Sequence, residues 1–148
     1  MPDLIRPDRD RPTIQAHLAS GTTVIADRYA FSGIAFSAQK GSYLNLTYEW
    51  CKAPEVGLPA PDLTLFLDIN PEVAMQRGGY GEERYEKEEV QARVRQIFSR
   101  IGKEMGNDRW VVIDAGQERE KVADNIWNSV VPLLGCIHHP VMRLWQNQ

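Results

Sequence analysis

Short apolar runs that end abruptly in a polar residue constrain the fold of this chain more than any other feature. Residues 63–69 form a strongly apolar run, and residues 110–115 form another. A third run covers residues 22–26 and ends at Asp27. These runs predict strands, with residues 63–69 buried on both faces, and helical patterns separate them along the chain. The alternation predicts an α/β fold in which helices cover both faces of a parallel sheet and the crossovers are right-handed.

Start signals and apolar spacing locate the helices. Asn70-Pro71-Glu72 offers an N-cap, a proline for the first helical position and an acid for the first turn, so a helix is predicted through residue 76. Apolar residues at spacings of three and four predict a longer helix over about residues 83–105. Other helices are expected over residues 12–20, 31–38 and 43–51, and in a closing segment with Val122, Ile126, Val130 and Leu134 on one face.

Composition limits the class of protein. The chain has 148 residues, of which 43% are hydrophobic, and a formal net charge of −3, so it suits one domain and argues against a general nucleic-acid or anionic-membrane binder. Two cysteines are too few for a disulfide framework, and no apolar run is long enough to span a bilayer. We therefore expect a reducing compartment: the cytoplasm, with the nucleus or a mitochondrion as alternatives.

Asp27 and Arg28 are the first candidate functional pair. They follow the run at residues 22–26, and the carboxyl ends of strands are where open α/β sheets bind ligands. The acid can hold hydrated magnesium, and the guanidinium can bind phosphate oxygens with two hydrogen bonds. Gly33 permits close approach of a ligand and Phe36 offers a flat face, so the group suits a nucleotide. The alternative is a structural ion pair that caps the next helix.

Residues 77–86 form the second candidate group. The sequence Arg-Gly-Gly-Tyr-Gly-Glu-Glu-Arg-Tyr-Glu combines glycines with two arginines and two tyrosines. A mobile segment that carries arginine suits phosphoryl transfer, because it can bring positive charge over the transferring group and exclude water. The alternative is a solvated loop whose acids favour the start of a helix.

Three stretches together resemble the thymidylate kinases, in the form closest to eukaryotic members. They are residues 27–36 (Asp-Arg-Tyr-Ala-Phe-Ser-Gly-Ile-Ala-Phe), 57–63 (Gly-Leu-Pro-Ala-Pro-Asp-Leu) and 77–86. The resemblance implies the parallel sheet of a P-loop nucleoside monophosphate kinase, without the first two strands of the family fold. Residues 1–12 are expected to be irregular and unlike the family, and residues 13–148 to form a partial domain of it.

The resemblance also implies roles for single residues on the acceptor side. Asp27 would organise Mg²⁺ through water, and Arg28 would bind the phosphate of dTMP. Gly33 and Phe36 would line the thymidine pocket, and Tyr85 would contact the nucleoside.

On the donor side, Arg84 would stabilise the charge on the transferring phosphoryl group, with Glu83 orienting it, and Arg77 would lie against the adenine of ATP. The implied enzyme is a transferase of dTDP and dTTP biosynthesis that moves the γ-phosphoryl group of Mg-ATP to dTMP. The family also implies a homodimer.

One family motif has no counterpart in these 148 residues. The pattern Gly-x-x-x-x-Gly-Lys-Ser/Thr, whose backbone amides and lysine hold the ATP phosphates, does not occur. We therefore expect the chain alone to be impaired in catalysis. Two alternatives stay open: a non-catalytic remnant that binds a nucleotide weakly or pairs with a full-length subunit, and a kinase whose acceptor is UMP or dGMP.

Overall fold

Two compact units make up the chain. The computed structural model describes residues 7–41, 46–77, 88–135 and 139–146. The first unit combines Met1–Ala60 with Pro140–Gln148, and the second is Pro61–His139. The first contains the α-helices α1 (Pro7–Ala19), α2 (Ala30–Ala38) and α4 (Tyr48–Lys52) and the 3₁₀ helix η1 (Ala53–Glu55). The second contains β1 (Thr64–Asp68), α5 (Pro71–Gln76), α6 (Glu88–Met105), β2 (Trp110–Asp114), α7 (Arg119–Val130) and η2 (Val131–Leu133).

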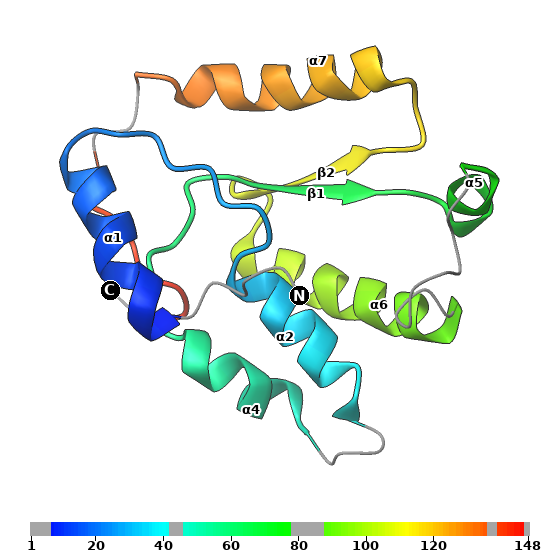
Figure 1. Ribbon diagram of the computed structural model, residues 1–148, viewed down its shortest axis with the longest axis horizontal. Helices are drawn as coiled ribbons and strands as arrows, with labels where there is room; N and C mark the ends of the chain where they lie inside the picture. Colours follow the sequence, from blue (N-terminus) through cyan, green and yellow to red (C-terminus); the bar gives the residue numbers. More distant parts are fainter. Residues whose placement is uncertain (1–6, 42–45, 78–87, 136–138, 147–148) are drawn as a thin grey trace. The chain divides into compact units, whose positions relative to one another are not determined.

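The second unit is built on one parallel pair of strands. β1 and β2 pair in register from Thr64 opposite Trp110 to Asp68 opposite Asp114. A parallel pair needs a crossover connection, which α5 and α6 supply. Within this unit α6 lies on one face of the pair and α7 on the other (Figure 1). The predicted parallel arrangement with helices on both faces is confirmed for this pair of strands.

Aromatic rings join α6 to the strands. The ring of Phe66 on β1 lies 4.8 Å from that of Phe98 on α6 and 5.8 Å from that of Trp110 on β2, between centroids. Val94 and Ile101 of α6 are buried, as the predicted apolar stripe requires. A Cβ on Gly102 would lie only 2.8 Å from Nε1 of Trp110, so a glycine at this helical position lets the indole approach the backbone of α6.

The first unit is closed by residues near the carboxyl end of the chain. The backbone N–H of Gly57 donates to Leu144 O at 2.9 Å, and the N–H of Leu144 donates to Leu58 O at 2.9 Å. The Leu144 side chain is buried, and the ring of Trp145 meets that of Phe31 on α2 edge to face at 5.9 Å. The residues after Pro140 are therefore an integral part of this unit.

The strand predicted over residues 22–26 is absent. These residues have no regular secondary structure and pair with no strand in the part of the chain that the structure describes. Ile25 is 92% exposed, so the run does not supply the buried strand that its composition indicates. A strand needs a neighbour to satisfy its backbone groups and bury its side chains, and no such neighbour lies beside this segment among the described residues.

Other boundaries differ from expectation in smaller ways. α1 begins at Pro7, so the prediction that residues 1–12 are irregular is wrong for residues 7–12. Leu67 of β1 is 50% exposed, so residues 63–69 are not buried on both faces. The predicted ends of α5 and α6, at Gln76 and Met105, are confirmed, whereas the predicted start of the longer helix lies outside the described residues.

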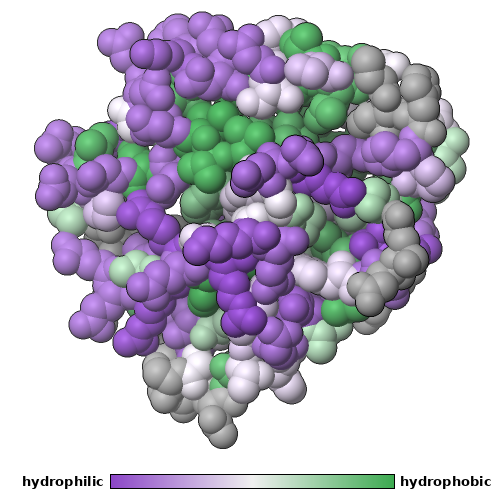
Figure 2. Space-filling model, turned by 180° about the vertical axis from the view of Figure 1, so that it is seen from behind, coloured by the Kyte–Doolittle hydropathy of each residue, from purple (hydrophilic) through white to green (hydrophobic). Residues whose placement is uncertain are grey.

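Apolar side chains also reach the surface. The face in Figure 2 shows apolar side chains gathered among hydrophilic ones. Leu67 and Val112 of the strands, and Trp127 of α7, are among the large apolar residues that are exposed. None of the helices that the structure describes combines the length and apolar character needed to cross a membrane.

The close contact at Gly102 makes its replacement costly. Gly102→Ala should lower the free energy of unfolding by about 1–2 kcal/mol, because overpacking against the buried Trp110 ring outweighs the gain in helix propensity. Ser99→Ala, on an exposed position of the same helix, is the control and should be neutral or slightly stabilising. Urea unfolding measures both; a stabilised Gly102→Ala variant would contradict the contact.

Candidate functional site

Asp27 and Arg28 lie in the turn that leads into α2. Both residues are exposed. Arg28 has φ 57°, a left-handed backbone conformation that non-glycine residues rarely adopt and that costs on the order of 1 kcal/mol. The carbon of its guanidinium lies 5.5 Å from the centroid of the Phe36 ring. The turn thus places a cation over the aromatic ring that the sequence singled out.

Tyr29 holds this turn in place. Its hydroxyl donates to Pro59 O at 3.0 Å, and its ring meets that of Phe31 edge to face at 6.4 Å. Pro59 belongs to the second stretch of sequence that carries the family resemblance. The first and second stretches are therefore in contact through a tyrosine next to Arg28.

Gly33 and Glu55 approach each other in the first unit. Gly33 is half-buried in α2, and a Cβ on it would lie 3.6 Å from Glu55 Oε1. Burial raises the pKa of the Glu55 carboxyl above its ordinary value. Sequence reasoning did not select Glu55, because its proximity to Gly33 depends on how α2 and η1 pack.

Arg77 lies at the C-cap of α5 in the second unit. Its Nη2 donates to Gln117 O at 3.1 Å, so it contacts the loop that follows β2. Asp114, the last residue of β2, holds that loop: its Oδ1 accepts the N–H of Gly116 at 2.8 Å, and its Oδ2 accepts a hydrogen bond from Gln117 Nε2 at 3.3 Å. The structure thus brings Arg77 to Gln117, in a loop whose backbone is held by the Asp114 carboxylate.

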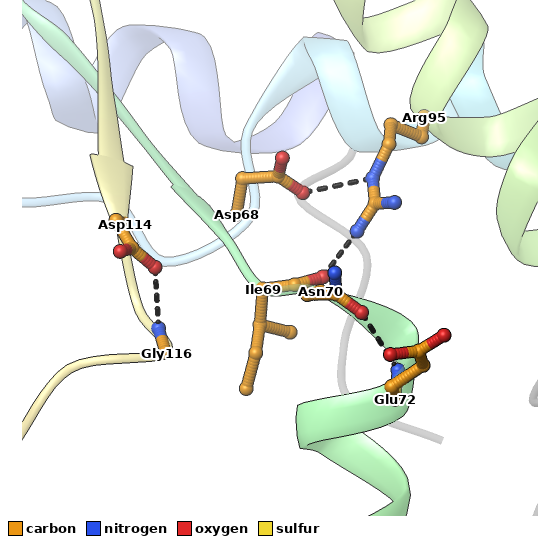
Figure 3. A network of polar contacts seen from close by, with 7 residues as sticks. All are labelled: Asp68, Ile69, Asn70, Glu72, Arg95, Asp114 and Gly116. Atoms are coloured by element: carbon orange, nitrogen blue, oxygen red, sulfur yellow. Dashed lines mark hydrogen bonds and ion pairs between the residues drawn. The ribbon is translucent and has the colours of Figure 1, made fainter.

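A cavity of about 410 Å³ opens in the second unit where β1 and β2 end. Its lining residues come from both strands, the start of α5 and α6: Asp68, Asn70, Pro71, Arg95, Val112 and Asp114. Figure 3 shows the polar contacts around it. Arg95 Nε donates to Asp68 Oδ1 at 2.8 Å, which forms a partly exposed ion pair. Asp68 and Arg95 were missed from the sequence, although the position of Asp68 at a strand end was a usable signal.

The predicted site residues fall into three groups. Asp27, Arg28, Gly33 and Phe36 all belong to the first unit, and Arg77 belongs to the second. The remaining candidates lie outside the described residues: Glu83, Arg84 and Tyr85. The interaction of Arg28 with Phe36 joins two predicted residues, whereas Arg77 contacts Gln117, which the sequence did not single out.

The residues around Asp27 fit a hydrated magnesium ion bound through water. Mg²⁺ keeps several waters and binds through one or two carboxylates together with substrate phosphates. Asp27 offers one exposed carboxylate, and no cluster of three or more His, Cys, Asp or Glu that could enclose a metal occurs among the described residues. This donor set suits outer-sphere contact and does not suit a cage made by protein alone.

Comparison with known proteins gives consistent matches. The family model described as thymidylate kinase matches residues 6–126. The thymidylate kinase of Arabidopsis thaliana is 46% identical over 139 residues, which are 93% of this chain and 50% of that protein. The thymidylate kinase of Schizosaccharomyces pombe is 49% identical over 119 residues, covering 79% of this chain and 55% of that protein. The chain therefore spans about half the length of these relatives.

A solved structure extends the match to the fold. The thymidylate kinase of Candida albicans superposes with a TM-score of 0.79 at 29% identity, covering 93% of this chain and 68% of that chain. The P-loop kinase fold expected from the sequence is thus confirmed in the part that the chain supplies.

Glu55 should give the chain a pH-dependent stability. Because burial raises its folded-state pKa from 4.5, the stability linked to its protonated form is present below that ordinary value and is lost as pH rises through the raised pKa. Glu55→Gln removes the charge at similar size, so it should raise the urea midpoint at neutral pH and change it little well below the ordinary pKa. The exposed Asp124→Asn is the control; an equal gain at both pH values would contradict this account.

Proposed function

The chain belongs to the thymidylate kinase family, and from that premise we propose that it serves the transfer of the γ-phosphoryl group of ATP to dTMP, which forms dTDP. The observation that carries the proposal is the placement of the Arg28 guanidinium over the ring of Phe36, which follows Gly33 by three positions in α2. A phosphate-binding cation and a flat apolar ring within one unit match the two ends of a nucleoside monophosphate.

The first unit supplies the acceptor side in this proposal. Arg28 binds the phosphate of dTMP, because its planar fork can donate two hydrogen bonds to phosphate oxygens. Phe36 lies against the base, and Gly33 leaves room for the nucleoside. The left-handed backbone of Arg28 supports this assignment, since strained conformations at exposed turns are concentrated at functional sites.

The second unit supplies the donor side. Arg77 lies against the adenine of ATP, close to the loop after β2 that it contacts. Arg84, with Glu83 beside it in sequence, neutralises the transferring phosphoryl group, whereas Tyr85 contacts the nucleoside of the acceptor, dTMP. Catalysis then consists of positioning and charge neutralisation, with no covalent intermediate.

Asp27 would hold a magnesium ion through water with its exposed carboxylate, which is adjacent to Arg28 in sequence. The ion would supply positive charge that neutralises the ATP phosphates. A homodimer and a reducing compartment remain predictions of the family resemblance and of the cysteine content.

Titration of the chain with dTMP tests the acceptor side. We expect binding that Arg28→Leu weakens by about tenfold to a hundredfold, because charge-assisted hydrogen bonds to the phosphate are lost. Arg119→Leu removes the same charge from an exposed position on α7 and is the control, with unchanged affinity. Isothermal calorimetry measures all three proteins. Absence of dTMP binding by the unaltered chain, or equal binding of UMP and dGMP, would overturn the acceptor assignment.

Turnover and co-elution together separate the kinase from a binding remnant. A coupled assay of ADP formation from Mg-ATP and dTMP should give little turnover with these 148 residues alone, because the Gly-x-x-x-x-Gly-Lys-Ser/Thr motif is not among them. dTMP binding with near-normal turnover would refute the need for that motif. Binding without turnover, together with co-elution with an intact thymidylate kinase, would favour the remnant.

A further inference from the structure

Arg95 connects α6 to the turn between β1 and α5. Its Nε donates to Asp68 Oδ1 at 2.8 Å, and its Nη2 donates to the backbone oxygen of Ile69 (Figure 3). One guanidinium therefore fixes two successive residues at the point where the chain leaves the sheet. A lysine carries a single ammonium group and lacks the planar arrangement of N–H donors of a guanidinium, so this pair of contacts is specific to arginine.

α5 depends on contacts at its two ends. It has six residues and none of them is buried, so it lacks both the length that stabilises an isolated helix and an apolar face held in a core. At its start, Asn70 Oδ1 accepts the N–H of Glu72 at 2.9 Å. At its end, Nη2 of Arg77 donates to Gln117 O at 3.1 Å. The turn that Arg95 holds is thus directly connected to the cap from which α5 begins.

We propose that Arg95 is a positioning residue for Arg77, acting through the β1–α5 turn and α5. The inference rests on the proposed function, in which Arg77 lies against the adenine of ATP. By fixing Asp68 and Ile69, Arg95 sets where α5 begins, and the length of α5 then sets where Arg77 stands relative to the loop after β2. Arg95 itself does not touch the nucleotide in this role.

The effect of Arg95 on global stability should be small. The side chains of Arg95 and Asp68 are 40% and 36% exposed, and ion pairs with this degree of exposure contribute little to the free energy of unfolding. A change in nucleotide affinity without a matching change in unfolding midpoint is therefore the signature of positioning. A general loss of structure would change both.

Binding of Mg-ATP gives the first test. Arg95→Leu should weaken ATP binding by about tenfold, because α5 no longer holds Arg77 in its position against the adenine, while dTMP affinity changes less than about twofold. Arg95→Lys should recover only part of this loss, because it keeps the charge without the fork. Arg100→Leu, which removes a cation from the solvent-facing side of α6, is the matched control and should bind both nucleotides normally.

A double-mutant cycle tests whether the effect passes through Arg77. If it does, Arg95→Leu causes no further loss of ATP affinity in a chain that already carries Arg77→Ala. Independent, additive losses would overturn the proposal. Unchanged ATP affinity in Arg95→Leu alone, with the unaltered chain binding ATP, would overturn it as well.

Amide hydrogen exchange provides a measurement that needs no nucleotide. Arg95→Leu should increase exchange in the backbone of α5 while β2 and α7 keep their protection, and Arg100→Leu should change none of the three. Unchanged hydrogen exchange in α5 would overturn the proposal, whatever the measured ATP affinity of the variant. Increased exchange in α5, with no ATP binding by the unaltered chain, would support the anchoring of α5 and refute the donor assignment of Arg77.

Discussion

The in-register pairing of β1 with β2 is the constraint on which the second unit depends. It satisfies the backbone hydrogen-bonding groups between the strands and places Asp68 opposite Asp114 at the carboxyl ends of both strands. Phe66 and Trp110 thereby lie together under Phe98 of α6, and the two carboxylates lie at the mouth of one cavity. A slip of one residue would move the aromatic side chains to the opposite face and separate the polar groups from their partners.

Features of the fold that depend on neighbouring residues were predicted from the sequence. Features that depend on contacts between distant residues were not. Asn70 caps α5 as expected, and the apolar spacing located the buried face of α6, because both depend on residues a few positions apart. The run ending at Asp27 failed as a strand since its composition describes a buried environment that only a neighbouring strand can supply. The pair of Asp68 and Arg95 was missed because 27 positions separate its members.

The residues of the candidate site were selected from the sequence by their chemistry, but their conformation was not predictable. Arg28 and Phe36 were singled out for a phosphate and a flat ring, and the structure brings them into contact. Their eight-residue separation in sequence does not reveal the left-handed backbone at Arg28. The burial of Glu55 likewise results from the packing of η1, which no sequence pattern predicts.

The return of the chain to its first unit has a consequence for the order of folding. Arg143 Nη1 donates to Gly57 O across 86 positions, so the second unit is an insertion between two parts of the first. During synthesis all residues of the second unit emerge before Leu144 does. The strands and α6 can therefore form their final contacts before residues 140–148, the last segment of the first unit, have been synthesised. The first unit is thus completed last, once the residues after Pro140 have been synthesised.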